Sequence, residues 1–275
     1  LREGTPVLVG TTDTALEVYA SGAVSPGCAT VKLATAGRIC VITDAPVKSR
    51  QFFNYRHVIP GLWYPGTGTR SCAASYKWYR DVFGAAELRD AEEAGVSAYA
   101  LLDEAAKNAP PGSDNLFFHP YLLGEMTPYY DDKLRASFTG VGMHHTKAHF
   151  SRSVMEGVAY SMRDCLEEVK RMDIAVSEYR MIGGGAKGAL WRQILCDVLA
   201  VPLTVTVEND SSLGSAMLAG VAVGAFSDFR DSVEKCVAVS ARMAPITENV
   251  EIYAQGFENY RRIQRALSAV YHGMF

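Results

Sequence analysis

The sequence predicts an α/β fold in which helices flank a β-sheet, and three observations predict it. From residue 147 onward, helix-like and strand-like segments alternate, an order typical of parallel strands joined by helices. Within residues 29–43, two β-rich runs meet at a small-residue turn, as in a hairpin. Three glycines, 183–185, join an apolar strand-like segment directly to an amphipathic helix.

Size and composition narrow the class of protein. A chain of 275 residues that is 48% hydrophobic can bury a sizeable core, as one large domain or two small ones. The net charge is −3 and the Lys and Arg residues are scattered, which argues against nucleic-acid binding. No apolar run reaches the roughly 18 to 20 residues that span a bilayer. The chain starts at Leu1 without a secretory signal, and we expect it to be part of a longer protein.

The six cysteines indicate a reduced protein. No two form a C-x-x-C pair, and none stands with another Cys or a His at zinc spacing. Several lie in apolar surroundings, Cys40 and Cys196 among them. We therefore expect small buried residues of a cytoplasmic protein.

The first half is expected to be mostly extended, because its runs of Val, Ile, Thr and aromatic residues favour strands. The composition of 107–115, "KNAPPGSDN", indicates a loop. In chain order, the expected elements are a strand at 5–9, a short helical segment opening at Asp13, a hairpin within 29–43, an extended segment at 50–64, a short helix around 71–83 and an irregular segment at 104–135.

The second half contains the clearest helix, at 147–172, with Thr146 as its expected N-cap. Its apolar residues recur at steps of three and four: Met155, Val158, Met162, Cys165, Val169 and Met172. After it we expect a strand at 179–182, a helix at about 188–200, a strand at 203–207, a helix at about 212–225 capped by Ser211 or Ser212, and a final amphipathic helix at about 249–270.

The glycine run is the first candidate site. Ligands of open α/β sheets bind at the carboxyl ends of strands, a glycine turn lets a ligand approach the backbone, and a helix N-terminus offers N–H groups to an anion. The letters "GGGAKG" match neither G-x-G-x-x-G nor the P-loop. A tight strand-to-helix turn without a ligand explains the glycines equally well.

Two further residues are candidates. Asp13 follows a predicted strand and could act as a general base or a magnesium ligand, although an Asp there also commonly caps its own helix. Thr35 stands on the turn of the predicted hairpin, where backbone amides and the hydroxyl could hold phosphate oxygens. An ordinary hairpin turn is the simpler interpretation of Thr35 on these residues alone.

Segments in a fixed order, spread over roughly residues 5–225, resemble the C-terminal, ATP-binding domain of FGGY carbohydrate kinases. The most specific is 136–164, "ASFTGVGMHHTKAHFSRSVMEGVAYSMRD", which resembles the family's second signature. The others are "GTTDTALEVYASGA" at 10–23, "KLATAG" at 32–37, "SCAASYKWY" at 71–79, "FFHPYLLGEMTP" at 117–128 and "IGGGAKGALWRQILCDVLAVPL" at 182–203.

This resemblance implies an actin-like, ribonuclease-H-like ATPase domain with a mixed sheet, and it assigns roles to residues. Asp13 would be the catalytic base and would help to hold Mg²⁺ through water. Thr35 and the amides around it would cradle the transferring phosphate, and the adenosine of ATP would lie against residues 184–186. The implied ATP contacts are Ala34, Thr35, Ala73, Lys77, Gly183, Gly184, Gly185, Ala186, Lys187 and Gly188.

The implied reaction moves the γ-phosphoryl group of ATP to a hydroxyl of a sugar or polyol. The letters "PYLLGEMTP" favour a ketopentose such as xylulose, with ribulose, gluconate, rhamnulose, glycerol and erythritol as alternatives. Residues 1–275 would be the nucleotide-binding half alone, without the N-terminal sugar-binding domain. The isolated chain is therefore expected to be inactive or nearly so, and a homodimer is left open.

One departure from the family keeps an alternative open. The phosphate turn reads Ala34-Thr35-Ala36 where Gly-Thr-Ser or Gly-Thr-Gly is usual, and alanine restricts the backbone more than glycine does. The main alternative is therefore a catalytically degenerate nucleotide-binding module of the same fold. The signature within 136–156 argues against a third hypothesis, a chaperone-like ATPase of the same superfamily.

Overall fold

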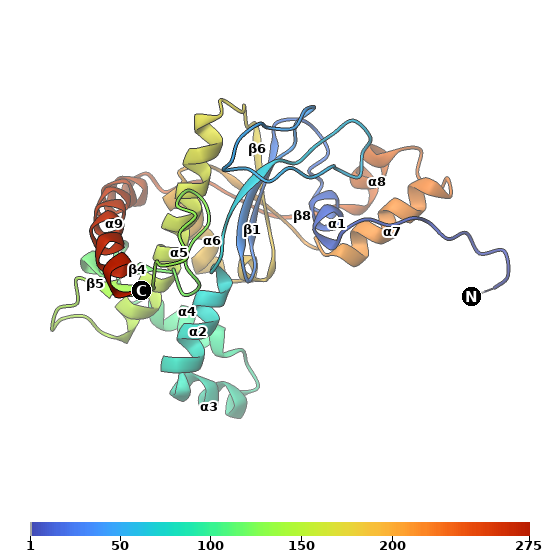
Figure 1. The fold of residues 1–275 in the computed structure, drawn as a ribbon. Coiled ribbons are helices and arrows are strands. Elements are labelled where there is room, and N and C mark those ends of the chain that lie inside the picture. The colour runs from blue at the N-terminus through green and yellow to red at the C-terminus, as the bar shows by residue number, and fades with distance from the viewer. Residues whose placement is uncertain (1) are drawn as a thin grey trace.

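The computed structural model describes residues 2–275 and confirms the α/β prediction, with a mixed sheet at its centre (Figure 1). The hairpin within 29–43 is present, and the two strands predicted in the second half run parallel to its first strand. The outer strands at both edges are antiparallel to their neighbours. In spatial order the sheet contains β3 (Gly66–Thr69), β2 (Gly37–Val41), β1 (Cys28–Leu33), β6 (Glu178–Ile182), β7 (Leu203–Thr206) and β8 (Val239–Met243).

Helices cover both faces of this sheet (Figure 1). One face carries α1 (Asp13–Ala20), α7 (Ser211–Ala222) and α8 (Phe229–Cys236). The other face carries α5 (Lys147–Arg171), α6 (Ala189–Leu199) and α9 (Thr247–Met274). The helices α2 (Ala73–Phe83), α3 (Ala85–Ala94) and α4 (Ala98–Ala106) lie together at one end, and a two-stranded sheet of β4 (Phe117–His119) and β5 (Ser137–Thr139) lies beside α9. The short turn η1 (Ser113–Asn115) precedes β4 in the chain.

The two-residue period of the strands explains why both faces are covered. Val31 and Leu33 of β1 enter the larger core, which α5 and α6 complete. Cys28, at the start of the same strand, packs with Ala15 and Val18 of α1 in a separate cluster on the opposite face.

Helix α5 is the centre of the larger core, and its prediction is confirmed. The apolar residues predicted to face the core are buried up to Val169. Met172 is the exception, because it is the C-terminal cap and its side chain is 38% exposed. Thr146 caps the helix as predicted, in a capping box with His149.

Some predicted elements are wrong or were missed. Residues 5–10 form no strand, and Val7 and Val9 are 85% and 97% exposed, because this segment pairs with no other strand of the described residues. Residues 50–64 contribute isolated bridges only. The cap of α7 is Asp210, whose carboxylate accepts from the Leu213 N–H at 2.9 Å, rather than Ser211 or Ser212. The α-helices and strands that were not predicted are α4, α8, β3, β4, β5 and β8.

The predicted burial of the cysteines is confirmed for five of the six residues, whereas Cys236 is only partly buried, and all six are free. Burial raises the pKa of the Cys40 and Cys72 thiols to about 12, which keeps them protonated and unreactive. Within residues 2–275, no helix combines the length and the apolar character needed to cross a membrane.

Candidate functional site

A cavity of about 860 Å³ opens at the carboxyl ends of the parallel strands β1 and β6, where ligands of open α/β sheets bind. The turn after β1 and the short helix η2 (Gly184–Lys187) after β6 form one wall. Residues of α2, α4 and the start of α6 form the other. The lining residues are Ala34, Thr35, Ala73, Tyr76, Ser97, Tyr99, Ala100, Asp103, Glu104, Lys107, Gly184, Gly185, Lys187, Gly188, Ala189, Leu190 and Trp191.

The glycine run has two different physical causes. Gly183 has φ +93°, and a Cβ on it would lie 2.6 Å from the carbonyl oxygen of Leu33. A Cβ on Gly185 would lie 2.9 Å from the Leu33 side chain. Both glycines are therefore explained by the close approach of β1. Gly184 would meet nothing within 4 Å, and it faces the open space of the cavity.

The turn of residues 34–36 contacts the start of α2 through its carbonyl groups. The oxygen of Ala34 accepts from the Ala73 N–H at 2.8 Å, and that of Thr35 accepts from the Cys72 N–H at 2.9 Å. These bonds satisfy N–H groups that a helix start leaves without partners. The N–H groups of Thr35 and Ala36 donate to no acceptor within residues 2–275, and the Thr35 side chain is exposed. Thr35 lines the cavity, whereas Ala36 lies beside the lining, so the turn has backbone donors without protein partners at the cavity's edge.

The α2–α4 wall is aromatic and contains one partly buried carboxylate. The Tyr76 ring lies 5.5 Å from that of Tyr99 and 5.3 Å from that of Trp191, measured between centroids. The Tyr76 hydroxyl donates to Oδ1 of Asp103 at 2.9 Å. Burial raises the pKa of Asp103, although the Tyr76 hydrogen bond and the nearby Lys107 oppose this. Sequence reasoning predicted the contact at Ala73 of α2 but missed the α4 side of this wall, because no helix was predicted at 98–106.

Most of the predicted nucleotide contacts come together in this cavity, although they lie up to 154 positions apart in the chain, from Ala34 to Gly188. Gly183 and Ala186 lie beside it without lining it, and Ala186 is buried. Lys77 is not brought to the cavity: it is exposed, and its ammonium pairs with Asp81 at 2.8 Å. The predicted residues that line the cavity are Ala34, Thr35, Ala73, Gly184, Gly185, Lys187 and Gly188.

Asp13 lies outside the lining of this cavity, at the first residue of α1. The capping alternative for it is wrong, because the cap is Thr12, whose hydroxyl accepts from the Ala15 N–H at 3.3 Å. Oδ1 of Asp13 accepts from the Thr14 N–H at 2.7 Å, and the side chain is exposed. The part of the chain that the structure describes contains no group of three or more His, Cys, Asp or Glu residues placed to hold a metal ion.

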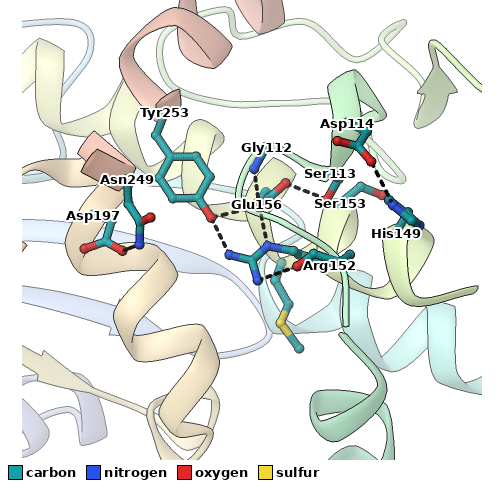
Figure 2. Close-up of polar contacts among 12 residues, drawn as sticks. Gly112, Ser113, Asp114, His149, Arg152, Ser153, Glu156, Asp197, Asn249 and Tyr253 are labelled. Carbon is teal, nitrogen blue, oxygen red and sulfur yellow. Dashed lines mark hydrogen bonds and ion pairs between the residues drawn. The ribbon is translucent and has the colours of Figure 1, made fainter. Parts of the chain in front are cut away.

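A buried ion pair holds the segment that follows α4 (Figure 2). Glu156 and Arg152, one turn apart on α5, are both almost fully buried and pair at 2.8 Å. Glu156 also accepts from the Gly112 N–H at 2.9 Å and the Ser113 hydroxyl at 2.7 Å, and Arg152 donates to the Ala109 carbonyl at 3.1 Å. The pair therefore anchors residues 109–113, the segment that follows α4 in the chain.

Comparison with known proteins places these features in a family. The family described as "FGGY family of carbohydrate kinases, C-terminal domain" matches residues 34–223. A gluconokinase of Bacillus subtilis (strain 168) is 30% identical over 270 residues, 97% of this chain and 52% of that protein. A xylulose kinase of Lactococcus lactis subsp. lactis (strain IL1403) is 30% identical over 272 residues, with the same coverage of 97% and 52%.

A solved structure shows the same fold. The crystal structure of xylulose kinase from Rhodospirillum rubrum superimposes with a TM-score of 0.85 at 27% identity, and the match covers 99% of this chain and 54% of that protein. This confirms the predicted mixed sheet with flanking helices, the actin-like ATPase fold. The chain spans about half the length of the relatives that it matches.

Proposed function

We propose, from the premise that this chain belongs to the FGGY family of carbohydrate kinases, that it is the nucleotide-binding half of an enzyme that phosphorylates a sugar or polyol with ATP. The observation that carries the proposal is the cavity at the ends of β1 and β6. It gathers the Thr35 turn and the open face of Gly184, two features on which the family resemblance rests. A planar nucleoside can lie against Gly184, because no side chain stands in its way.

The chemistry that these residues support is positioning and charge stabilisation, since phosphoryl transfer has a loose transition state. The free N–H groups of Thr35 and Ala36, with the Thr35 hydroxyl, would donate to oxygens of the transferring phosphate. Asp13 would accept the proton of the attacking hydroxyl. Its exposed position leaves it open to a substrate from outside this chain.

The family implies Mg²⁺, and Asp13 fits an ion held through water. Magnesium keeps several of its waters and is bound by one or two carboxylates together with substrate phosphates. Oδ1 of Asp13 accepts a hydrogen bond from Thr14 of the same helix, which leaves the carboxylate able to accept from a water of the ion. When bound, the ion supplies neutralisation of the phosphate charge.

A ketopentose such as xylulose is the proposed acceptor, in agreement with the xylulose kinase relative and the xylulose kinase structure. Gluconate is the second candidate, because the gluconokinase relative is equally similar, at 30% identity. The remaining half of the relatives' length has no counterpart in this chain. We propose that an N-terminal domain supplies most sugar contacts and that residues 1–275 alone do not turn over.

Calorimetric titration with MgADP tests the nucleotide site. The chain is expected to bind, and Gly184→Arg is expected to abolish binding, because the new side chain would fill the space that Gly184 leaves open. Gly184→Ala is the matched control and is expected to bind nearly normally. If the Arg variant and the unmodified chain bind MgADP with equal affinity, the nucleotide does not bind in this cavity.

The alternative function is a degenerate nucleotide-binding module, which the Ala34-Thr35-Ala36 turn favours. Turnover by the longer protein separates the two, with xylulose and gluconate tested first. Asp13→Asn is expected to lower turnover by about 10²- to 10⁴-fold and to leave ADP affinity unchanged. Nucleotide binding without phosphorylation of any sugar or polyol would favour the module.

A further inference from the structure

We infer that Asp103 selects the nucleoside, by accepting a hydrogen bond from a neutral donor of the bound nucleotide, either a ribose hydroxyl or the exocyclic amine of the base. Asp103 lies on α4 and lines the cavity, with its carboxylate close to Gly188. The inference rests on the proposed function, since it requires a nucleotide in this cavity.

The geometry leaves one carboxylate oxygen free for a ligand. Oδ1 of Asp103 accepts from the Tyr76 hydroxyl at 2.9 Å, and this bond fixes the carboxylate. Oδ2 accepts no hydrogen bond from residues 2–275. A Cβ on Gly188 would lie 2.7 Å from Oδ2, so glycine at 188 leaves this oxygen uncovered.

The surroundings make a hydrogen bond at this oxygen selective. Tyr76 and Trp191 are almost fully buried beside it and Asp103 itself is half-buried, so a nucleotide bound here would exclude the remaining water from this oxygen. Hydrogen bonds to an ionised acceptor are roughly twice as strong as neutral ones. An acceptor left without a partner in such a place carries its desolvation cost. A nucleotide that lacks the matching donor is therefore discriminated against.

The charge of the wall argues that it faces the nucleoside rather than the phosphates. Two carboxylates of α4, Asp103 and Glu104, line the cavity. Lys107, the cation nearest to them on the helix, is already paired with Glu104. This pair compensates the charge of Glu104, so the Asp103 carboxylate is the one that would repel phosphate oxygens, whereas a hydroxyl or an amine donates to it.

The test compares a carboxylate of the cavity with one outside it. Asp103→Asn replaces the free acceptor by an amide, and Glu93→Gln makes the same charge change at an exposed α3 residue that does not line the cavity. Binding of ADP, 2′-deoxyadenosine diphosphate, 3′-deoxyadenosine diphosphate and inosine diphosphate is measured by calorimetry for the unmodified chain and both variants. The thermal midpoint of each protein without nucleotide is recorded alongside.

We expect Asp103→Asn to raise the Kd for ADP by about tenfold to a hundredfold, the range for losing a hydrogen bond to a charged acceptor. Glu93→Gln is expected to change it less than about twofold. The unmodified chain should bind one of the three analogues more weakly than ADP, and Asp103→Asn should remove that preference. Weaker binding of a deoxy analogue would identify a ribose hydroxyl as the donor, and weaker binding of inosine diphosphate would identify the exocyclic amine.

Two results would overturn the assignment of Asp103 while the proposed function stands: ADP binding that Asp103→Asn leaves unchanged, or equal weakening for all four nucleotides. No ADP binding by the unmodified chain would overturn both. Tyr76→Phe is a second variant that keeps the carboxylate but removes the hydroxyl that fixes it. It is expected to reduce the difference in Kd between ADP and the disfavoured analogue without abolishing ADP binding.

Discussion

The buried ion pair of α5 and the cavity at the carboxyl ends of β1 and β6 use polar groups in opposite ways. Glu156 is almost fully buried and accepts four hydrogen bonds, from Arg152, Tyr253, Gly112 and Ser113 (Figure 2). At the cavity, the N–H groups of Thr35 and of the adjacent Ala36 have no acceptor within residues 2–275.

This difference separates structural from ligand-binding polar groups. A buried charge is tolerated only when protein groups satisfy it completely, so the Glu156 set is explained without a ligand. Polar groups that line an open cavity without protein partners are explained by what binds there. The 136–164 signature therefore belongs to the scaffold of the site, although it is the most family-specific stretch of the sequence.

The largest expected effect is on the free energy of unfolding, for a substitution in the buried ion pair. Glu156→Gln leaves Arg152 as a buried charge without its partner, and breaking such a pair costs roughly 3–5 kcal/mol of unfolding free energy. Glu167→Gln is the control, since this α5 residue pairs with Lys170 at the surface and should cost less than about 1 kcal/mol. Urea denaturation measures both, and similar losses would contradict the structural role of Glu156.

A buried acid on the same helix predicts a pH dependence. Burial raises the pKa of Asp164 to about 7, although the Tyr129 hydrogen bond and Arg261 oppose this. The native state thus holds this proton more tightly than the unfolded chain does. The contribution of Asp164 to stability is present below about pH 4 and is lost as the pH rises to about 7, by at most roughly 4 kcal/mol.

Denaturation at several pH values tests this contribution. Asp164→Asn should flatten the fall in unfolding free energy between about pH 4 and pH 7 relative to the unmodified chain. The exposed Asp44 is the matched control, and Asp44→Asn should leave the profile unchanged. A profile that Asp164→Asn does not alter would mean that Asp164 is ionised in the native state throughout this range.

The glycine run contains both kinds of position: Gly183 is required by the close approach of β1, and Gly184 faces the cavity. Substitutions at these two adjacent positions should therefore have different effects on stability. Gly183→Ala places a Cβ at φ +93° and 2.6 Å from the Leu33 oxygen, strain of roughly 1–3 kcal/mol. Gly184→Ala meets nothing within 4 Å and should leave the thermal midpoint nearly unchanged. Equal shifts of the midpoint would show that the close approach of β1 does not limit position 183.

Local patterns in the sequence predicted the parts of the fold that are decided locally. The three- and four-residue spacing of α5 and the hairpin turn at Thr35 needed no long-range information. The strand at 5–9 was wrong because β-rich composition does not supply a neighbouring strand. The glycine run predicted the position of the cavity but not which glycine faces it. Asp103 could not be predicted, because its role depends on Tyr76 and Gly188, which are distant in sequence.

The smallest expected effect concerns two lysines that the sequence assigned to the same nucleotide. Lys187 is exposed and lines the cavity, whereas Lys77 pairs with Asp81 away from the lining. Lys187→Ala should raise the Kd for ADP about two- to fivefold, as for a solvated charge contact, and less so at high salt. Lys77→Ala should leave the Kd unchanged in the same titration. The reverse order would place the phosphates beside α2 rather than beside η2, and the cavity would then hold the nucleotide in the opposite orientation.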